Sequence, residues 1–380
     1  MSEQVFTNAK IVLADEVING TLCVRDGKIQ DISDRNSSLS SAHDLNKDLL
    51  LPGLVELHTD NLEKHMTPRP KTEWPSVAAV ISHDNQVASA GITTVFDAIA
   101  VGDVNEGSSR VKRLEEMVGS LVHAGKENLL RADHLIHLRC EVSYSDMAPA
   151  LDKLANNTLV RMLSVMDHTP GQRQFVSLEA YYIYYQGKYG LSDREMKRFI
   201  SDRQDDQKKY SSSNRKHVVG TAHDKGFALA SHDDATSSHV AEAVSDGVTV
   251  AEFPTTLEAA KSSHNSGLAV MMGGPNLVRG KSHSGNISAG ALAKDGFLDI
   301  ISSDYVPHSL LHAAMLLYNN FENYDLPRSV RTVTKTPAER VGLTDRGEIA
   351  LGKRADLIHV HHSSHHPIIK SVWREGHRVS

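Results

Sequence analysis

The 380-residue sequence predicts an α/β protein made of a (β/α)8 TIM-like barrel and a small β-sandwich domain that both termini build. Short apolar runs recur through the middle of the chain and alternate with amphipathic stretches, which is the pattern of βα units around a parallel sheet. Both ends instead carry strand-like runs separated by turns. We therefore expect the β domain to comprise residues 1–52 and 345–380, with the barrel over residues 53–344.

The first and last segments read as short strands. Near the N-terminus, β-branched alternation marks KIVLA, TLCVRDG and KIQDIS, and Asp26-Gly27 is a two-residue hairpin signal. The tail has the same texture in GEIALGKRADLIHVHH and SVWREGHRV. Because strand-like segments occur at both ends of the chain and the middle has a different pattern, we expect the two ends to pair in one domain.

Eight apolar runs between Leu51 and Tyr305 are the expected barrel strands. In order they are LVELH, TTVFDAIA, HLIHLRCEV, VRMLSVMDH, ALASHDD, VTVAEFP, LAVMMGG and DIISSDY. Stretches such as SRVKRLEEMVGSLVHAG have helical amphipathicity between them, and eight such units over 250 to 300 residues are typical of this barrel. The polar segment near 176–217 predicts a helical excursion, for which a solvated insertion is favoured over a lid.

Composition excludes several classes of protein. No stretch approaches the ~18 apolar residues of a membrane span, and the N-terminus lacks a signal-peptide pattern. Two cysteines, Cys23 and Cys140, cannot form a disulfide framework, so we expect reduced thiols and a cytoplasmic protein. The net charge of -6 argues against a nucleic-acid partner. Nothing in the sequence fixes the oligomeric state, and a homo-oligomer is compatible with it.

Ionisable residues fall at the carboxyl ends of the expected strands, which in such barrels face one mouth. They are His58, Asp60, Glu141, His168, His232 and Asp304. Because residues i and i+2 of a strand point the same way, His58 and Asp60 can share one ion. Imidazoles and carboxylates together suit Zn, Mn or Fe, so the sequence predicts divalent metal ions, two if the carboxylates bridge.

Each of these residues also has an ordinary structural explanation. A single histidine at a strand end is more often packed than ligating, and an aspartate there often caps a helix. Six residues in six matching positions favour the metal site. We expect the remaining histidines to be structural or at a solvated strand edge: His65, His83, His134, His137, His264, His359, His361, His362, His365 and His366.

The sequence resembles the amidohydrolase superfamily in LPGLVELHTDN, in the ADLIHV tail and in the order HxD, Glu, His, His, Asp. Within it, HTDNLEKHMTPRP, DHTPGQ, ASHDDAT, GGPNLVRGKSHSGN and SSDYVP are similar to the PhnM family. This resemblance implies metal-dependent hydrolysis of α-D-ribose 1-methylphosphonate 5-triphosphate to the 5-phosphate and diphosphate, in the carbon–phosphorus lyase pathway. Superfamily members commonly have HxH and a carboxylated lysine. Here Asp60 replaces the second histidine, and Glu141 is the candidate bridging ligand.

The substrate that the resemblance implies is strongly anionic, so basic residues are expected at the mouth. The candidates are Arg69, Lys71, Arg139, Arg173, Arg279, Lys281 and His283. The last three lie in a Gly-rich segment suited to phosphate. That segment is not a P-loop, because the register of G-x-x-x-x-G-K-S puts Pro275 where the first glycine must be.

Asp304 is the expected general base that activates water. Two alternatives stay open at this point. One is hydrolysis of a C–N bond, as in an amino-sugar deacetylase or a cyclic amidase. The other is a non-catalytic barrel that scaffolds partners.

Overall fold

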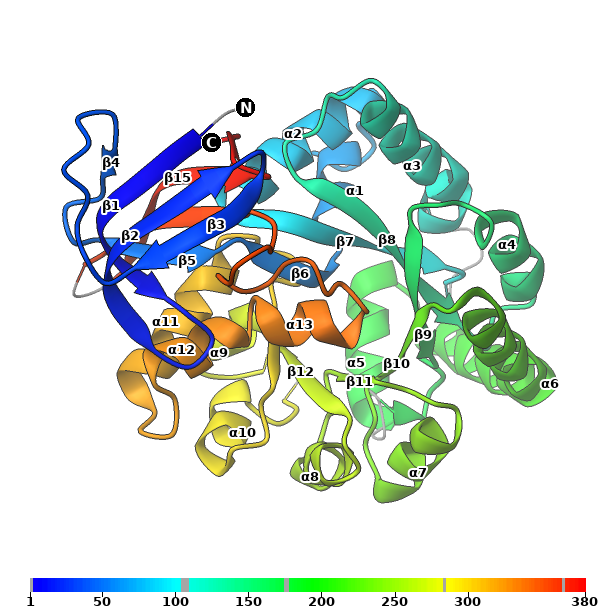
Figure 1. The fold of residues 1–380 in the computed structure, drawn as a ribbon. Coiled ribbons are helices and arrows are strands. Elements are labelled where there is room, and N and C mark those ends of the chain that lie inside the picture. The colour runs from blue at the N-terminus through cyan, green and yellow to red at the C-terminus, as the bar shows by residue number, and fades with distance from the viewer. Residues whose placement is uncertain (1–2, 104–108, 174–177, 283–284, 364–365) are drawn as a thin grey trace.

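The computed structural model describes residues 3–103, 109–173, 178–282, 285–363 and 366–380. Its centre is a sheet of eight parallel strands in the order β13-β12-β11-β10-β9-β8-β7-β6 (Figure 1). The strands are β6 (Leu54–Thr59), β7 (Ile92–Val101), β8 (Asp133–Glu141), β9 (Val160–Met166), β10 (Ala228–His232), β11 (Val250–Glu252), β12 (Ala269–Gly273) and β13 (Ile300–Ser302). Each strand overlaps one of the eight apolar runs, so the predicted barrel is confirmed.

The barrel nearly closes between its first and last strands. Thr59 and Asp304 form a parallel bridge, and the Asp304 N–H donates to the His58 carbonyl at 3.1 Å. Every residue of β6, β7 and β12 is buried, as expected for a parallel sheet that is covered on both faces. Closure therefore brings the ends of β6 and β13, with their predicted site residues, side by side.

Helices surround the sheet. They are α1 (Asn61–Met66), α2 (Ser76–Ser89), α3 (Ser109–Lys126), α4 (Met147–Leu154), α5 (Leu178–Tyr189), α6 (Asp193–Lys225), α7 (Ser237–Ser245), α8 (Leu257–Asn265), α9 (Gly274–Arg279), α10 (Ala289–Asp295), α11 (Ser309–Asn320), α12 (Leu326–Arg331) and α13 (Lys335–Arg340). None of the described helices is long and apolar enough to cross a membrane.

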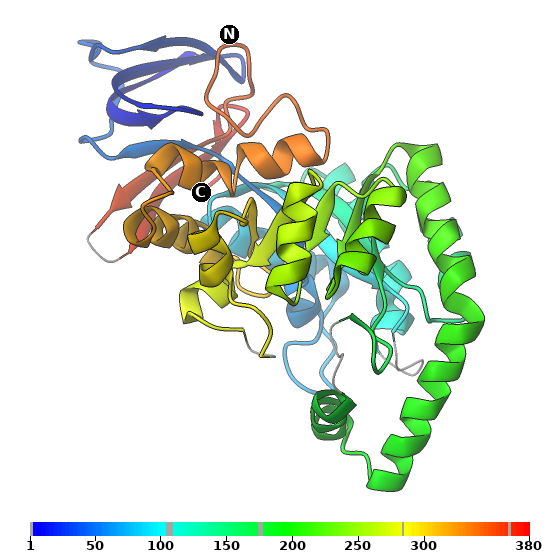
Figure 2. The same ribbon diagram turned by 90° about the horizontal axis from the view of Figure 1, so that it is seen from below.

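Helices α5 and α6 occupy the polar segment that follows β9. A capping box fixes the start of α6: the Ser192 side chain accepts from the Glu195 N–H, and the Glu195 carboxylate accepts from the Ser192 N–H. Gly226 ends the helix in the left-handed conformation that glycine adopts without strain. Figure 2 shows α6 running along one side of the barrel and beyond it, where it carries α5.

The two termini build a second sheet, here called the terminal sheet. Its strands follow the order β16-β15-β14-β5-β1-β2-β3, with β4 paired to β1, in one continuous path. They are β1 (Glu3–Val12), β2 (Val17–Arg25), β3 (Lys28–Ser33), β4 (His43–Asp44), β5 (Leu49–Pro52), β14 (Leu357–His362), β15 (Pro367–Arg374) and β16 (His377–Arg378). The predicted hairpin turn is present, with positive φ at both Asp26 and Gly27.

One carboxylate links the C-terminal segment to the barrel. Asp133, the first residue of β8, accepts from Arg346 and Arg354 at 2.7 Å each and from Arg374 at 3.1 Å. The three arginines hold the pKa of Asp133 below its ordinary value even though burial opposes them. The C-terminal segment is thereby fixed to the starting edge of a barrel strand, away from the carboxyl ends.

Candidate active site

The carboxyl ends of the barrel strands surround a cavity of about 630 Å³. All six predicted metal ligands line it: His58, Asp60, Glu141, His168, His232 and Asp304. They come from β6, β8, β9, β10 and β13 or from the residues directly after them. The structure thus brings together residues that are up to 246 positions apart in the sequence.

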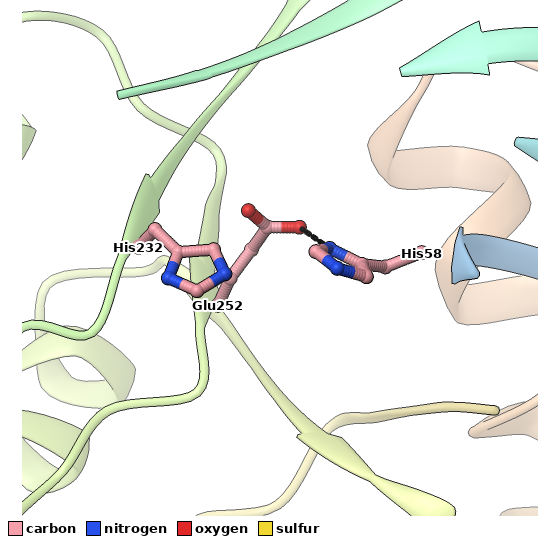
Figure 3. Close-up of side chains that lie close together, drawn as sticks. All are labelled: His58, His232 and Glu252. Carbon is pink, nitrogen blue, oxygen red and sulfur yellow. Dashed lines mark hydrogen bonds and ion pairs between the residues drawn. The ribbon is translucent and has the colours of Figure 1, made fainter. Parts of the chain in front are cut away.

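His58 is held from beneath by a buried glutamate. Its Nδ1–H donates to Glu252 Oε1 at 3.0 Å, and both side chains are almost fully buried (Figure 3). Burial, together with the positive charge of Arg139, lowers the pKa of His58 well below its ordinary value. The imidazole is therefore neutral, which leaves a lone pair on Nε2 for a metal ion.

His168 and His232 have the same kind of support. Glu141 Oε2 lies 2.7 Å from His168 Nδ1, and Asp233 Oδ2 lies 2.8 Å from His232 Nδ1. Glu141 Oε1 also accepts from Ser143 and from the His168 N–H. Both oxygens of Glu141 thus accept hydrogen bonds from protein groups, and the bridging role expected of this residue stays a prediction.

Asp60 and Asp304 meet where the barrel closes. The Asp60 N–H donates to the Asp304 carbonyl at 3.3 Å. Burial, with the negative charge of Asp60, raises the pKa of the Asp304 carboxyl to about 7. Asp304 also has φ 53°, in the left-handed region that aspartate tolerates better than most residues. A carboxylate with this pKa suits proton transfer near neutral pH.

Arg139 is a buried cation that forms no ion pair with the described residues. It is 9% exposed and lines the cavity, and its Nε is buried without a hydrogen-bond partner among the described residues. No carboxylate of the described chain lies within ion-pair distance of its guanidinium. Because a buried charge is costly unless it is paired, this arrangement favours an anionic ligand.

The other predicted basic residues divide into two groups. Arg279 and Lys281 line the cavity, whereas His283 lies outside the described residues. Arg69 and Lys71 are exposed between α1 and α2 and do not line it. The structure therefore does not bring these two side chains to the cavity, contrary to the expectation.

The expectation for Arg173 also has to be corrected. Its guanidinium is buried in ion pairs, with Asp234 on one side and with Glu242 at 3.1 Å on the other, and it does not line the cavity. These partners lie in the segment from β10 to α7, more than 60 residues further along the chain. The arginine fixes that segment instead of facing a substrate.

Two residues of the site were missed in the sequence. Glu252 ends strand β11 within the run VTVAEFP, and Asp233 directly follows His232. Both satisfy the rule that singled out the other six, since each lies at or directly after the carboxyl end of a strand. Applying that rule to every strand would have included them.

The arrangement fits divalent cations. Two adjoining groups each offer ligand atoms within 4.8 Å of one another: His58, His232 and Glu252 form one, and His168, His232 and Asp233 form the other. His232 Nε2 and Glu252 Oε2 are buried without a hydrogen-bond partner among the described residues. The unpaired Nε2 of His232, which lines the cavity, is an acceptor that a cation would satisfy.

A parallel barrel with imidazoles and carboxylates at its carboxyl mouth defines a hydrolase barrel of the amidohydrolase class. The family model described as "Amidohydrolase family" matches residues 223–376. Alpha-D-ribose 1-methylphosphonate 5-triphosphate diphosphatase of Escherichia coli (strain K12) is 47% identical over 376 residues, which covers 99% of this chain and 100% of that protein. The chain belongs to the PhnM family of the amidohydrolases.

More distant solved structures share the fold. A 5-methylcytosine deaminase from Klebsiella pneumoniae, liganded with 5-fluorocytosine, is 14% identical with a TM-score of 0.67, covering 99% of this chain and 97% of that one. An N-acetyl-D-glucosamine-6-phosphate deacetylase from Mycobacterium smegmatis is 13% identical with a TM-score of 0.64, covering 100% of both chains. At these identities the likeness concerns the fold alone.

Proposed function

We propose that this protein hydrolyses α-D-ribose 1-methylphosphonate 5-triphosphate to α-D-ribose 1-methylphosphonate 5-phosphate and diphosphate, as a cytoplasmic enzyme of phosphonate catabolism. The observation that carries the proposal is the 47% identity with the Escherichia coli diphosphatase along nearly the whole chain. The geometry supports a reaction on an anionic substrate at the barrel mouth.

The charges around the cavity explain why such a substrate would need cations. Among the described lining residues, the acidic side chains are Asp60, Glu63, Asp103, Glu141, Asp233 and Asp304, and the basic ones are Lys64, Arg139, Arg279 and Lys281. Six carboxylates against four cations would repel a triphosphate. Divalent ions among the carboxylates would reverse the local charge, while the basic side chains contact phosphate oxygens.

In this proposal His58, Asp60, His168, His232 and Asp304 hold two divalent ions, Zn, Mn or Fe, with Glu141 as a sixth candidate. Bound ions of this kind supply Lewis acidity and lower the pKa of water. Asp304 accepts the proton of the attacking water on its carboxylate. Arg139 binds the phosphate nearest the strand ends, and Arg279 and Lys281 bind the diphosphate that leaves.

The direct test is to incubate the purified protein with the triphosphate and identify the products by phosphorus NMR. We expect diphosphate and the sugar 5-phosphate in equal amounts. An amide substrate such as an N-acetyl amino sugar should not be turned over. Orthophosphate as the primary product would contradict the proposal, because it would mean that the γ phosphorus is attacked.

Metal dependence is a second expected outcome. Exhaustive chelation should abolish turnover, and addition of a divalent metal should restore it, because the cavity carries an excess of carboxylates. The metal bound per chain, measured by mass spectrometry before and after chelation, should follow the activity. Full turnover by a protein shown to be metal-free would refute this part of the proposal.

Isotope labelling tests which phosphorus of the triphosphate is attacked. One turnover in ¹⁸O-labelled water should place the label in the 5-phosphate on the ribose, since attack on the α phosphorus expels diphosphate as one piece. Label in the diphosphate would show attack on the β phosphorus. That result would overturn the assigned alignment of substrate and site.

A further inference from the structure

We propose that Glu252 is a positioning residue for His58. It holds the Nδ1–H of the imidazole from beneath the cavity, so that Nε2 faces the cavity and binds a divalent cation more tightly. This inference rests on the metal-dependent function proposed above. It assigns a role to a carboxylate that is not among the six ligands of that proposal.

The position of Glu252 indicates that it acts through His58. Its side chain is fully buried, and it does not line the cavity, whereas His58 does. Glu252 ends β11 and His58 lies on β6, and these strands are not neighbours in the sheet. The hydrogen bond therefore joins two strands with no backbone pairing of their own, from a side chain outside the cavity to one that lines it.

His137 also lies near Glu252, but its own hydrogen bond shows that it is not the partner of this glutamate. His137 Nδ1 lies 3.7 Å from Glu252 Oε1, beyond hydrogen-bond distance, and 3.0 Å from the Leu57 carbonyl, to which it donates. His58 Nδ1 is 3.0 Å from the same Oε1. The close, hydrogen-bonded partner of Glu252 is thus His58.

The two neighbouring imidazoles of the site also have a carboxylate on Nδ1. His168 Nδ1 is held by Glu141 at 2.7 Å, and His232 Nδ1 by Asp233 at 2.8 Å. A carboxylate on one ring nitrogen fixes the tautomer and the ring orientation and makes the other nitrogen a better donor to metal. Removal of such a carboxylate typically costs 10- to 100-fold in metal affinity.

The test is the affinity of the full-length protein for Zn²⁺, measured by competition with a chromophoric chelator, in the wild type, Glu252→Gln and Glu252→Asp. We expect both variants to bind about 10- to 100-fold more weakly with the same number of ions at saturation. The aspartate keeps the charge but is one methylene too short. If Glu252→Gln does not fold, Glu252→Asp decides the question by the same measurement.

Asp356→Asn is the matched control. Asp356 is also buried and accepts from Arg354 at 3.2 Å and from the Glu375 N–H at 2.8 Å, but it does not line the cavity. The control should keep the wild-type affinity for Zn²⁺ even if its melting temperature falls. An equal loss in the control would overturn the inference, because it would show that any buried acid affects the site through stability.

Two further results would also overturn it. Wild-type affinity in both Glu252 variants would mean that the carboxylate does not support His58. Loss of one ion per chain at saturation would mean that Glu252 is itself a ligand. Failure of the wild type to bind a divalent ion would instead refute the metal-dependent function, so the two failures are distinguishable.

Discussion

At the scale of single residues, the ionisable side chains of the site differ in whether they have a charged partner. The three imidazoles each have a carboxylate on Nδ1, whereas the buried Arg139 guanidinium has none among the described residues. A protein does not ordinarily bury a guanidinium without an acceptor, because the cost of desolvation is then not offset. The unpaired cation is the strongest local indication that the ligand is an anion.

Arg139→Ala should therefore raise KM for the triphosphate by about ten- to a hundredfold, since a hydrogen bond to a charged group contributes roughly 1.5–3 kcal/mol. The metal content should not fall. Steady-state kinetics and metal analysis together test this. Arg69→Ala is the control: Arg69 is exposed and outside the cavity, so its kinetics should stay those of the wild type. Equal effects in the two variants would contradict the assignment.

At the scale of elements, α2 is joined to β7 and β8 by a buried polar network outside the cavity. Asp97 accepts from His83 and His134 at 2.7 Å each, and Asp84 lies 3.3 Å from the other nitrogen of His134. Asn61, the residue after Asp60, donates to His83 at 3.0 Å. The network therefore extends from the interface of a helix with two strands to the first turn of α1, beside the site.

This network predicts a dependence of stability on pH. Burial alone would lower the pKa of His134, but Asp97 and Asp84 outweigh it and raise that pKa to about 9. A raised histidine pKa contributes stability that is fully present below about pH 6.5 and is lost as pH rises through 9. At 1.36 kcal/mol per unit, the loss amounts to about 3 kcal/mol.

Chemical denaturation between pH 6.5 and 9.5 measures this effect. The free energy of unfolding should fall more steeply with pH in the wild type than in His134→Gln. His217→Gln should behave as the wild type, because His217 pairs with Asp152 at an exposed position where ion pairs contribute little. The prediction fails if the pH dependence of His134→Gln equals that of the wild type.

The same elements show what could be predicted from the sequence. Apolar runs ended by His58, Glu141 or Asp304 identify both the strands and the mouth, because parallel strands all present their carboxyl ends to one side. Ion pairs between residues that are far apart in the chain leave no such pattern in the sequence. Arg173 reads as a basic residue near a strand end, yet Asp234 and Glu242 bind it, and only the fold brings them within reach.

At the scale of the whole molecule, the terminal sheet is attached to the barrel by charge as well as by strand order. Arg346, Arg354 and Arg374 converge on Asp133, whose side chain is 29% exposed. The expected domain boundaries at residues 52 and 345 stay a prediction. The three ion pairs nevertheless show that the C-terminal segment and the barrel are stabilised together.

Asp133→Asn should destabilise the protein by about 2–3 kcal/mol, somewhat less than the 3–5 kcal/mol typical when one partner of a fully buried pair is removed. It would leave three guanidinium groups without their shared anion. Urea unfolding measures the change. In Asp205→Asn, which removes an exposed pair with Lys208 on α6, the change should stay below about 1 kcal/mol. Equal destabilisation in the two variants would show that the ion pairs of Asp133 do not stabilise the protein more than an exposed pair does.

The pairing of β5 with β14 also has a consequence for synthesis. Leu51 lies opposite Ile358, so about 300 residues of chain are made after β5 before its partner strand exists. At 5–20 residues per second, a ribosome needs roughly 15 to 60 s for that interval. Throughout it, the apolar segment Leu49–Pro52 has an open edge, which is a ready template for pairing with another chain. The edge of β5 would thus be open to a chaperone, or to a second chain, until β14 has been made.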